Sequence, residues 1–143
     1  MPVDYSGQDL RGRDFSGQDL SRARLIRADL TGANLRGANL RGANLTVADL
    51  RGANLSVANL SVANLTNADL TNADLIRADL GLANLTNADL TGADLTGATL
   101  IRARLTGANL RGANLTGAFR RPGISRADLD GAEGLDTARG LVD

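Results

Sequence analysis

The sequence predicts an all-β solenoid, a rod of short coils stacked along one axis. Three observations predict it: an apolar residue at every fifth position from Tyr5 to Leu115, an alanine at every fifth position from Ala23 to Ala118, and turn-forming Gly, Asn or Asp in almost every unit. A period held over 23 units is the signature of a repeat architecture, in which neighbouring units bury together a core that none buries alone.

A five-residue period fits neither regular secondary structure. On an α-helix, successive steps of five residues rotate by a net angle of about 140°, so the leucines would spread over all sides. Along a β-strand, alternate leucines would point to opposite faces, because five is an odd number. The remaining solution is a chain that each unit turns by a fixed angle, with Gly, Asn and Asp at the bends.

The repeated A-(D/N)-L-x-x unit, as in Ala28-Asp29-Leu30, resembles the pentapeptide-repeat proteins, and the resemblance covers residues 3–118. It implies a right-handed quadrilateral β-helix of about six four-sided coils, with one pentapeptide on each face. It also implies that the Leu and Ala side chains point inward and the other three outward. Residues twenty apart then stack in ladders about 4.8 Å apart.

We expect one domain with three parts: an N-terminal irregular coil and cap over residues 1–22, a regular β-helix over 23–118, and a frame break and C-terminal cap over 119–143. In the first coil Gln8, Arg13 and Gln18 replace the alanine, and such larger groups can cover an open end. The frame breaks at Phe-Arg-Arg-Pro-Gly, where proline cannot donate to a ladder. Family members also make a homodimer contact near the C-terminus, so the resemblance implies a possible homodimer through this end.

The composition argues against an enzyme. The chain has no cysteine and no histidine, and all of its 16 basic residues are arginine. Thiolate chemistry, the commonest general base and Schiff-base lysines are therefore missing. Stacked carboxylates match the spacing of a retaining glycosidase pair, but a flat ladder lacks the pocket that separates the two pKa values. We expect no catalytic site, no cofactor and no metal.

The net charge and the hydropathy of the sequence restrict the classes of partner and the cellular location that we expect. The net charge of zero indicates neither direct nucleic-acid binding nor membrane binding. No run of 18 apolar residues occurs, and the first ten residues lack a secretory pattern, so we expect a cytoplasmic protein.

Stacked aspartates form a candidate acidic interaction ladder. Its members are Asp9, Asp29, Asp49, Asp69 and Asp89 on one face, with Asp74 and Asp94 on the next. One interpretation is local turn chemistry, because short Asp and Asn side chains accept hydrogen bonds from nearby N–H groups. The other follows from the resemblance: quinolone-resistance members of the family imitate the charge of DNA and occupy DNA gyrase. Duplex DNA carries about one charge per 1.7 Å, far more than this rod.

Val62, Leu82 and Ile101 form a candidate apolar patch for contact with a partner. We therefore predict a non-enzymatic protein-interaction scaffold with an unknown protein partner. The alternative is a DNA mimic that binds a type II topoisomerase, DNA gyrase or topoisomerase IV. Two minor alternatives stay open: calcium binding by stacked aspartates, and ice binding by a threonine column. That column comprises Thr46, Thr66, Thr86 and Thr106.

Overall fold

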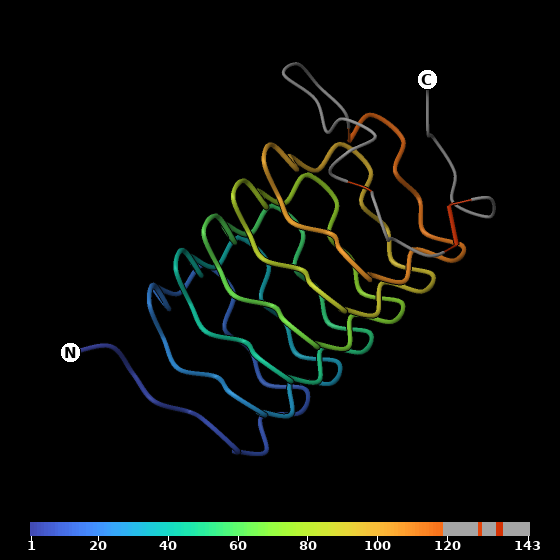
Figure 1. Ribbon diagram of the computed structural model, residues 1–143. Helices are drawn as coiled ribbons and strands as arrows, with labels where there is room; N and C mark the ends of the chain where they lie inside the picture. The colour runs from blue at the N-terminus through green and yellow to red at the C-terminus, as the bar shows by residue number, and fades with distance from the viewer. Residues whose placement is uncertain (119–128, 130–133, 136–143) are drawn as a thin grey trace.

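The chain forms a four-sided rod of stacked coils (Figure 1). The computed structural model describes residues 1–118, 129 and 134–135. Residues twenty apart pair in parallel, Asp9 with Asp29 and Asp29 with Asp49, and this register continues to Asn114. Each face contributes one ladder residue per coil, so residues 1–118 pair through single bridges and not through strands of several residues. The predicted register is confirmed.

Three backbone N–H groups of most units in the regular repeat hold neighbouring coils together. The N–H of Leu50 donates to the carbonyl of Asp69 on the next coil at 2.7 Å, and that of Gly52 donates to the carbonyl of Thr71 at 3.0 Å. The residue before each leucine donates in the opposite direction, to the previous coil, at 2.9–3.0 Å. The same bonds recur from coil to coil, so the stacking is a continuous hydrogen-bonded ladder.

The other two N–H groups of each unit build the corner. The N–H of Ala53 donates to the carbonyl of Leu50 at 3.0 Å, and Gly52 between them has a φ of +64°, as in a type II turn. The N–H of Arg51 donates to Oδ1 of Asp49 at 3.1 Å. Together with the inter-coil bonds, this Asx contact gives every N–H of the unit an acceptor. The recurrence of Asp and Asn therefore has a structural cause.

The corner requires a positive φ, and several residues adopt it at a cost. Val47, Val57, Val62 and Leu82 have φ values between +57° and +61°. A Cβ atom makes this left-handed conformation unfavourable by about 1–2 kcal/mol, and a β-branched residue is an outlier there. Glycine and asparagine, which occupy most other corners, adopt it more easily.

Replacing Val47 with asparagine is therefore expected to stabilise the fold by about 1 kcal/mol. Val47 is 44% exposed, so little burial is lost, and the same corner already carries Asn67 and Asn87 on the next two coils. Urea denaturation of the two proteins measures the difference. The converse change, Asn67→Val, is the control and should destabilise by a similar amount. Unchanged stability in both variants would contradict the strain.

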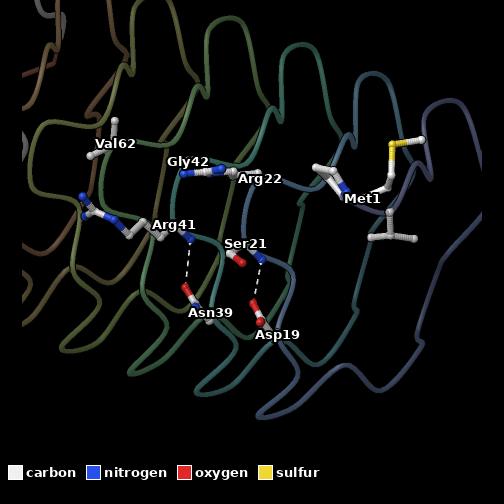
Figure 2. A pocket seen from close by; sticks show the side chains of 10 residues that line it. Met1, Asp19, Ser21, Arg22, Asn39, Arg41, Gly42 and Val62 are labelled. Atoms are coloured by element: carbon white, nitrogen blue, oxygen red, sulfur yellow. Dashed lines mark hydrogen bonds between the residues drawn. The ribbon is translucent and has the colours of Figure 1, made fainter.

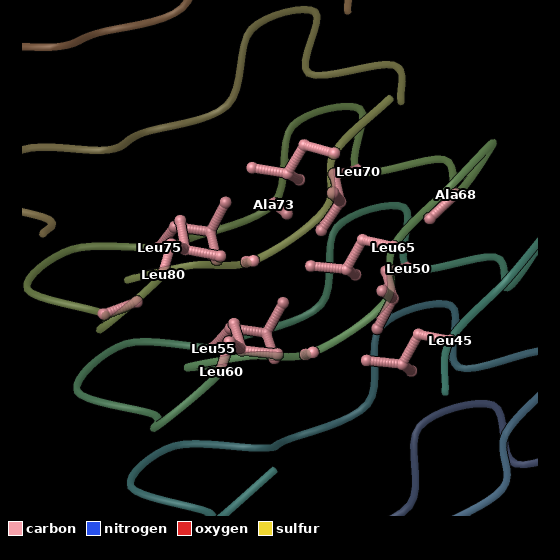
Figure 3. Packing of buried hydrophobic residues seen from close by; sticks show 14 of the residues in the cluster. Leu45, Leu50, Leu55, Leu60, Leu65, Ala68, Leu70, Ala73, Leu75 and Leu80 are labelled. Carbon is pink, nitrogen blue, oxygen red and sulfur yellow. The ribbon is translucent and has the colours of Figure 1, made fainter. Parts of the chain in front are cut away.

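Leucine and alanine fill the interior, as predicted. Figure 3 shows the leucines of two successive coils, stacked with their side chains turned into the shaft. From Ala23 to Ala118, every leucine and alanine at the repeat positions is at most 3% exposed. Burying a leucine contributes about 2 kcal/mol, so a core four leucines wide is sufficient when neighbouring coils cover both sides of each layer.

The N-terminal end carries larger side chains than the shaft. The rings of Tyr5 and Phe15 lie 5.8 Å apart, and the guanidinium of Arg13 lies 5.4 Å from the centre of the Phe15 ring. Gln8 and Gln18 are exposed. These groups lie in the first coil, which has no preceding neighbour, and their role as a cap stays a prediction.

At the opposite end, Leu129 is buried and Leu135 is partly buried against the core. The rest of the predicted C-terminal cap, 119–143, and the possible homodimer contact lie outside the described residues. The boundaries of the three predicted parts stay predictions. Within the described part of the chain, no helix has the length and hydrophobicity needed to cross a bilayer.

Candidate interaction surface

The aspartates of the predicted ladder lie in register, and their carboxylates take part in the turns. Each of the five on the first face pairs with its neighbour twenty residues away. Oδ1 of Asp69 accepts the N–H of Thr71 at 3.0 Å and its hydroxyl at 2.6 Å, and Asp89 makes the same two bonds with Thr91. One oxygen of each carboxylate is thus committed to its own corner.

Two arginines also pair with this ladder. Arg11 contacts Asp9 at 2.7 Å and Asp29 at 3.7 Å. The hydrogen bond from Arg11 lowers the pKa of Asp9 to about 2. These side chains are mostly exposed, so the pairs add little stability.

Arg51 repeats the arrangement two coils further along. It contacts Asp49 at 2.6 Å and Asp69 at 3.8 Å, and its hydrogen bond lowers the pKa of Asp49. Four of the five ladder carboxylates therefore lie beside a guanidinium, and among the described residues Asp89 alone of the five forms no ion pair. The first face does not present an unbroken row of negative charge.

Asp74 and Asp94 stack on the next face, as predicted. Asp74 accepts the N–H of Ile76, and Asp94 accepts the N–H and the hydroxyl of Thr96. No described residue forms an ion pair with either. In the described part of the chain, no three carboxylates converge as a metal site requires.

Val62, Leu82 and Ile101 line one shallow hollow on another face. Val62 is 45% exposed and Leu82 is 57% exposed. The other lining residues are polar or small: Arg41, Asn59, Ser61, Asp79, Gly81, Thr99 and Arg102. The structure thus brings the three residues of the apolar patch together and surrounds them with polar groups.

Gly81 lies in the hollow. It is the only glycine at the first turn position in the 23 units, whereas the stacked positions above and below it carry Ser61 and Ile101. Because Gly81 has no hydroxyl, Asp79 accepts its N–H at 2.9 Å without the hydroxyl bond that threonine supplies elsewhere. The sequence analysis missed Gly81, although its unusual place in the repeat is a visible signal.

Arg41 is held at the rim of this hollow. Its Nη1 donates to Oγ of Ser61 on the next coil at 2.9 Å, and Ser61 donates to Oδ1 of Asn59 at 2.6 Å. Because Ser61 is only 7% exposed, its hydroxyl is held in a fixed position and so fixes the Arg41 guanidinium that donates to it. Arg36 is anchored to Ser56 in the same way on the neighbouring face. Neither anchor was predicted from the sequence.

A second hollow continues the same edge toward the N-terminus (Figure 2). It begins at Met1 and shares Arg41 and Val62 with the first hollow. Gly42 has no side chain that would fill this second hollow. The Arg22 side chain lies against Gly42, and its Cγ would be 3.6 Å from a Cβ atom added there. The two hollows form one strip of mixed basic and apolar character.

The repeat geometry agrees with a comparison against known families. The model of the pentapeptide repeats matches residues 9–46, 43–81 and 83–119. The chain is a pentapeptide-repeat protein. Its rod is accordingly a right-handed quadrilateral β-helix, as the sequence resemblance implied. No curated protein sequence matches the chain significantly.

Solved structures of the family resemble this repeat protein closely. One from the Arabidopsis thaliana thylakoid lumen is 41% identical, with a TM-score of 0.69 over 71% of this chain and 70% of that one. Rfr23 of the cyanobacterium Cyanothece is 34% identical, with a TM-score of 0.61 over 75% and 83%. HetL of the cyanobacterium Nostoc, which is involved in heterocyst differentiation regulation, is 34% identical, with a TM-score of 0.53 over 100% and 76%.

Proposed function

We propose that this pentapeptide-repeat protein is a non-enzymatic interaction scaffold whose contact surface is the hollow lined by Val62, Leu82 and Ile101. The observation that carries the proposal is Leu82. It is the most exposed large apolar side chain of the described residues after Met1, at 57%, and its φ is +59°. Leu82 therefore serves neither the core nor the backbone of the corner.

Leu82 and Val62 share their backbone strain with Val47 and Val57, so the support for a contact surface comes from the strain together with the hollow in which both side chains lie. Glycine or asparagine at either corner would relieve about 1–2 kcal/mol of backbone strain. Strained residues concentrate at functional sites, where another requirement outweighs the cost. An apolar patch rimmed by arginines and other polar groups is also typical of a protein–protein contact.

The chemistry of the side chains supports a role without catalysis. The chain has no cysteine, histidine or lysine, and the hollow over Gly81 is open and shallow. Asp79 is the single carboxylate among its lining residues, so the hollow does not hold the pair of carboxylates that glycoside hydrolysis requires. Recognition of a partner is the function that these groups can perform.

Affinity capture with a matched pair of variants tests the proposal. The tagged protein, exposed to lysate from cells that carry its gene, is expected to retain a partner that Leu82→Asn loses. Val47→Asn is the control, because it makes the same kind of change at an equally strained, exposed corner of another face. Both variants should fold at least as stably as the parent. Equal capture by all three proteins would overturn the proposed surface.

The alternative, a DNA mimic that binds DNA gyrase or topoisomerase IV, has weaker support. Arg11 and Arg51 interrupt the charge of the first face, which leaves Asp74, Asp89 and Asp94 as the members of the predicted acidic ladder outside the ion pairs of the described residues. If the alternative holds, the protein inhibits or protects gyrase in a supercoiling reaction, and replacing these three by asparagine abolishes the effect. Loss of capture by Leu82→Asn does not follow from it, so the two functions are separable.

A further inference from the structure

We infer that the partner places an extended acidic segment over Gly81, with one apolar side chain in the hollow and a carboxylate on each side of it. The inference rests on the proposed function and adds the chemistry of the partner. It follows from the order of groups along the rod axis, where a basic, an apolar and a second basic group succeed one another.

Two arginines bracket the hollow along the axis. The guanidinium of Arg41 reaches forward to the level of Ser61, which anchors it at 2.9 Å. Gly81 lies one coil further, and Arg102 lines the hollow from the coil after that. Two coil spacings are about 10 Å, so the guanidinium of Arg41 and the backbone of Arg102 lie at levels roughly that far apart along the axis, with the apolar floor between them.

An extended chain spans this distance. Side chains at i, i+2 and i+4 share one face of a strand, and the outer two lie about 13 Å apart, so the Arg102 side chain has to cover only the remaining few ångströms. An acidic residue at i and another at i+4 reach the two guanidinium groups, and an apolar residue at i+2 enters the hollow among Val62, Leu82 and Ile101. Arginine donates to a carboxylate through two parallel N–H groups, which favours an acidic partner over a merely polar one.

The Asp79 carboxylate explains why the middle residue of the partner's segment, i+2, is apolar and not acidic. Its exposed carboxylate lies in the hollow, Oδ1 accepts the N–H of Gly81, and no described residue donates a hydrogen bond to Oδ2. It repels a third acidic side chain at i+2 but accepts a backbone N–H from the segment. The hollow therefore favours the order acidic, apolar, acidic over an uninterrupted acidic run.

The neighbouring face offers a built-in comparison. It has an anchored Arg36, an exposed Val57 and a nearby Arg77, but Ile76 stands at the place that Gly81 takes in the hollow. A hollow also lies on this face, but Gly97 stands at the place that Arg102 takes, so the second bracketing arginine is replaced there and this face should bind the acidic segment less tightly. It supplies matched control substitutions.

The test is fluorescence anisotropy with a labelled peptide that contains Glu-Thr-Leu-Thr-Glu between Gly-Ser flanks. We expect saturable binding, at least tenfold tighter than that of Lys-Thr-Leu-Thr-Lys or Glu-Thr-Gly-Thr-Glu, and weaker at high salt. The double variant Arg41→Gln with Arg102→Gln should bind at least tenfold more weakly. Gly81→Ile, which fills the hollow without requiring a positive φ, should do the same.

The controls are Arg36→Gln and Val57→Asn, which should leave binding unchanged. Absence of binding at millimolar protein, equal binding of the Glu and Lys peptides, or full binding by the double variant would overturn the inference. Under the proposed function, Leu82→Asn should abolish capture of the partner whether or not the partner's segment is acidic. Failed peptide binding with Leu82-dependent capture therefore contradicts the acidic segment alone, whereas failure of both contradicts the scaffold as well.

Discussion

Leu60→Ala is expected to lower the free energy of unfolding by about 3–5 kcal/mol. Leu60 is fully buried and lies in the column of Leu40 and Leu80, which are one coil away on either side in the twenty-residue register. Removing its side chain leaves a cavity between two hydrogen-bonded coils. The inter-coil hydrogen bonds of 2.7–3.0 Å fix the spacing of those coils, so the cavity cannot close.

Urea denaturation followed by circular dichroism measures this loss, and Leu10→Ala is the matched control. Leu10 belongs to the first coil, which has a neighbour on one side only, so its truncation should cost distinctly less. A similar cost at both positions would contradict a column whose stability comes from contacts with both neighbouring coils. A broader transition for Leu60→Ala would mean that the two halves of the rod unfold separately.

Ala58→Leu is expected to destabilise the fold by about 2–3 kcal/mol, although it adds apolar surface. Ala58 is 1% exposed, and the interior of each coil is already filled by four leucines. A larger side chain there must displace a leucine or widen the coil, and widening breaks ladder bonds to two neighbours. The narrow shaft thus requires alanine at this place as strictly as it requires leucine two residues later.

A leucine introduced at the alanine position of the first coil distinguishes overpacking of the shaft from a general effect of added leucine. Gln18 occupies the alanine position of its unit but is exposed, so Gln18→Leu should change stability by less than about 0.5 kcal/mol. Thermal unfolding of both variants provides the comparison. Full stability of Ala58→Leu would mean that the shaft has room that the packing does not indicate.

Much of the fold could be predicted because its determinants are local. The five-residue period places Leu30 and Ala28 inside and Asp29 outside in each unit, and turn chemistry accounts for the Asp and Asn positions. The four-sided coil came from family resemblance, since a period of five is compatible with other angles per unit. Once the coil length is known, the twenty-residue register of the ladders follows, as the pairing of Asp29 with Asp49 shows.

The interaction surface was predicted only in part. The sequence indicated Val62, Leu82 and Ile101 through their apolar character at outward positions. It placed Arg11 and Arg51 on the face of the acidic ladder, but it did not indicate that each would also contact an aspartate of the next coil. Which carboxylate an arginine meets depends on the direction that its side chain takes between coils.

The sequence by itself thus determined the inside of the rod, because burial and turn formation act on each pentapeptide in the same way. Only the tertiary structure decided the surface. Arg41 reaches across to Ser61, and Gly81 lies with Ser61 and Ile101 in one hollow, because residues about twenty apart are neighbours on successive coils. Such contacts depend on side-chain length and direction across neighbouring coils, which the five-residue pattern does not encode.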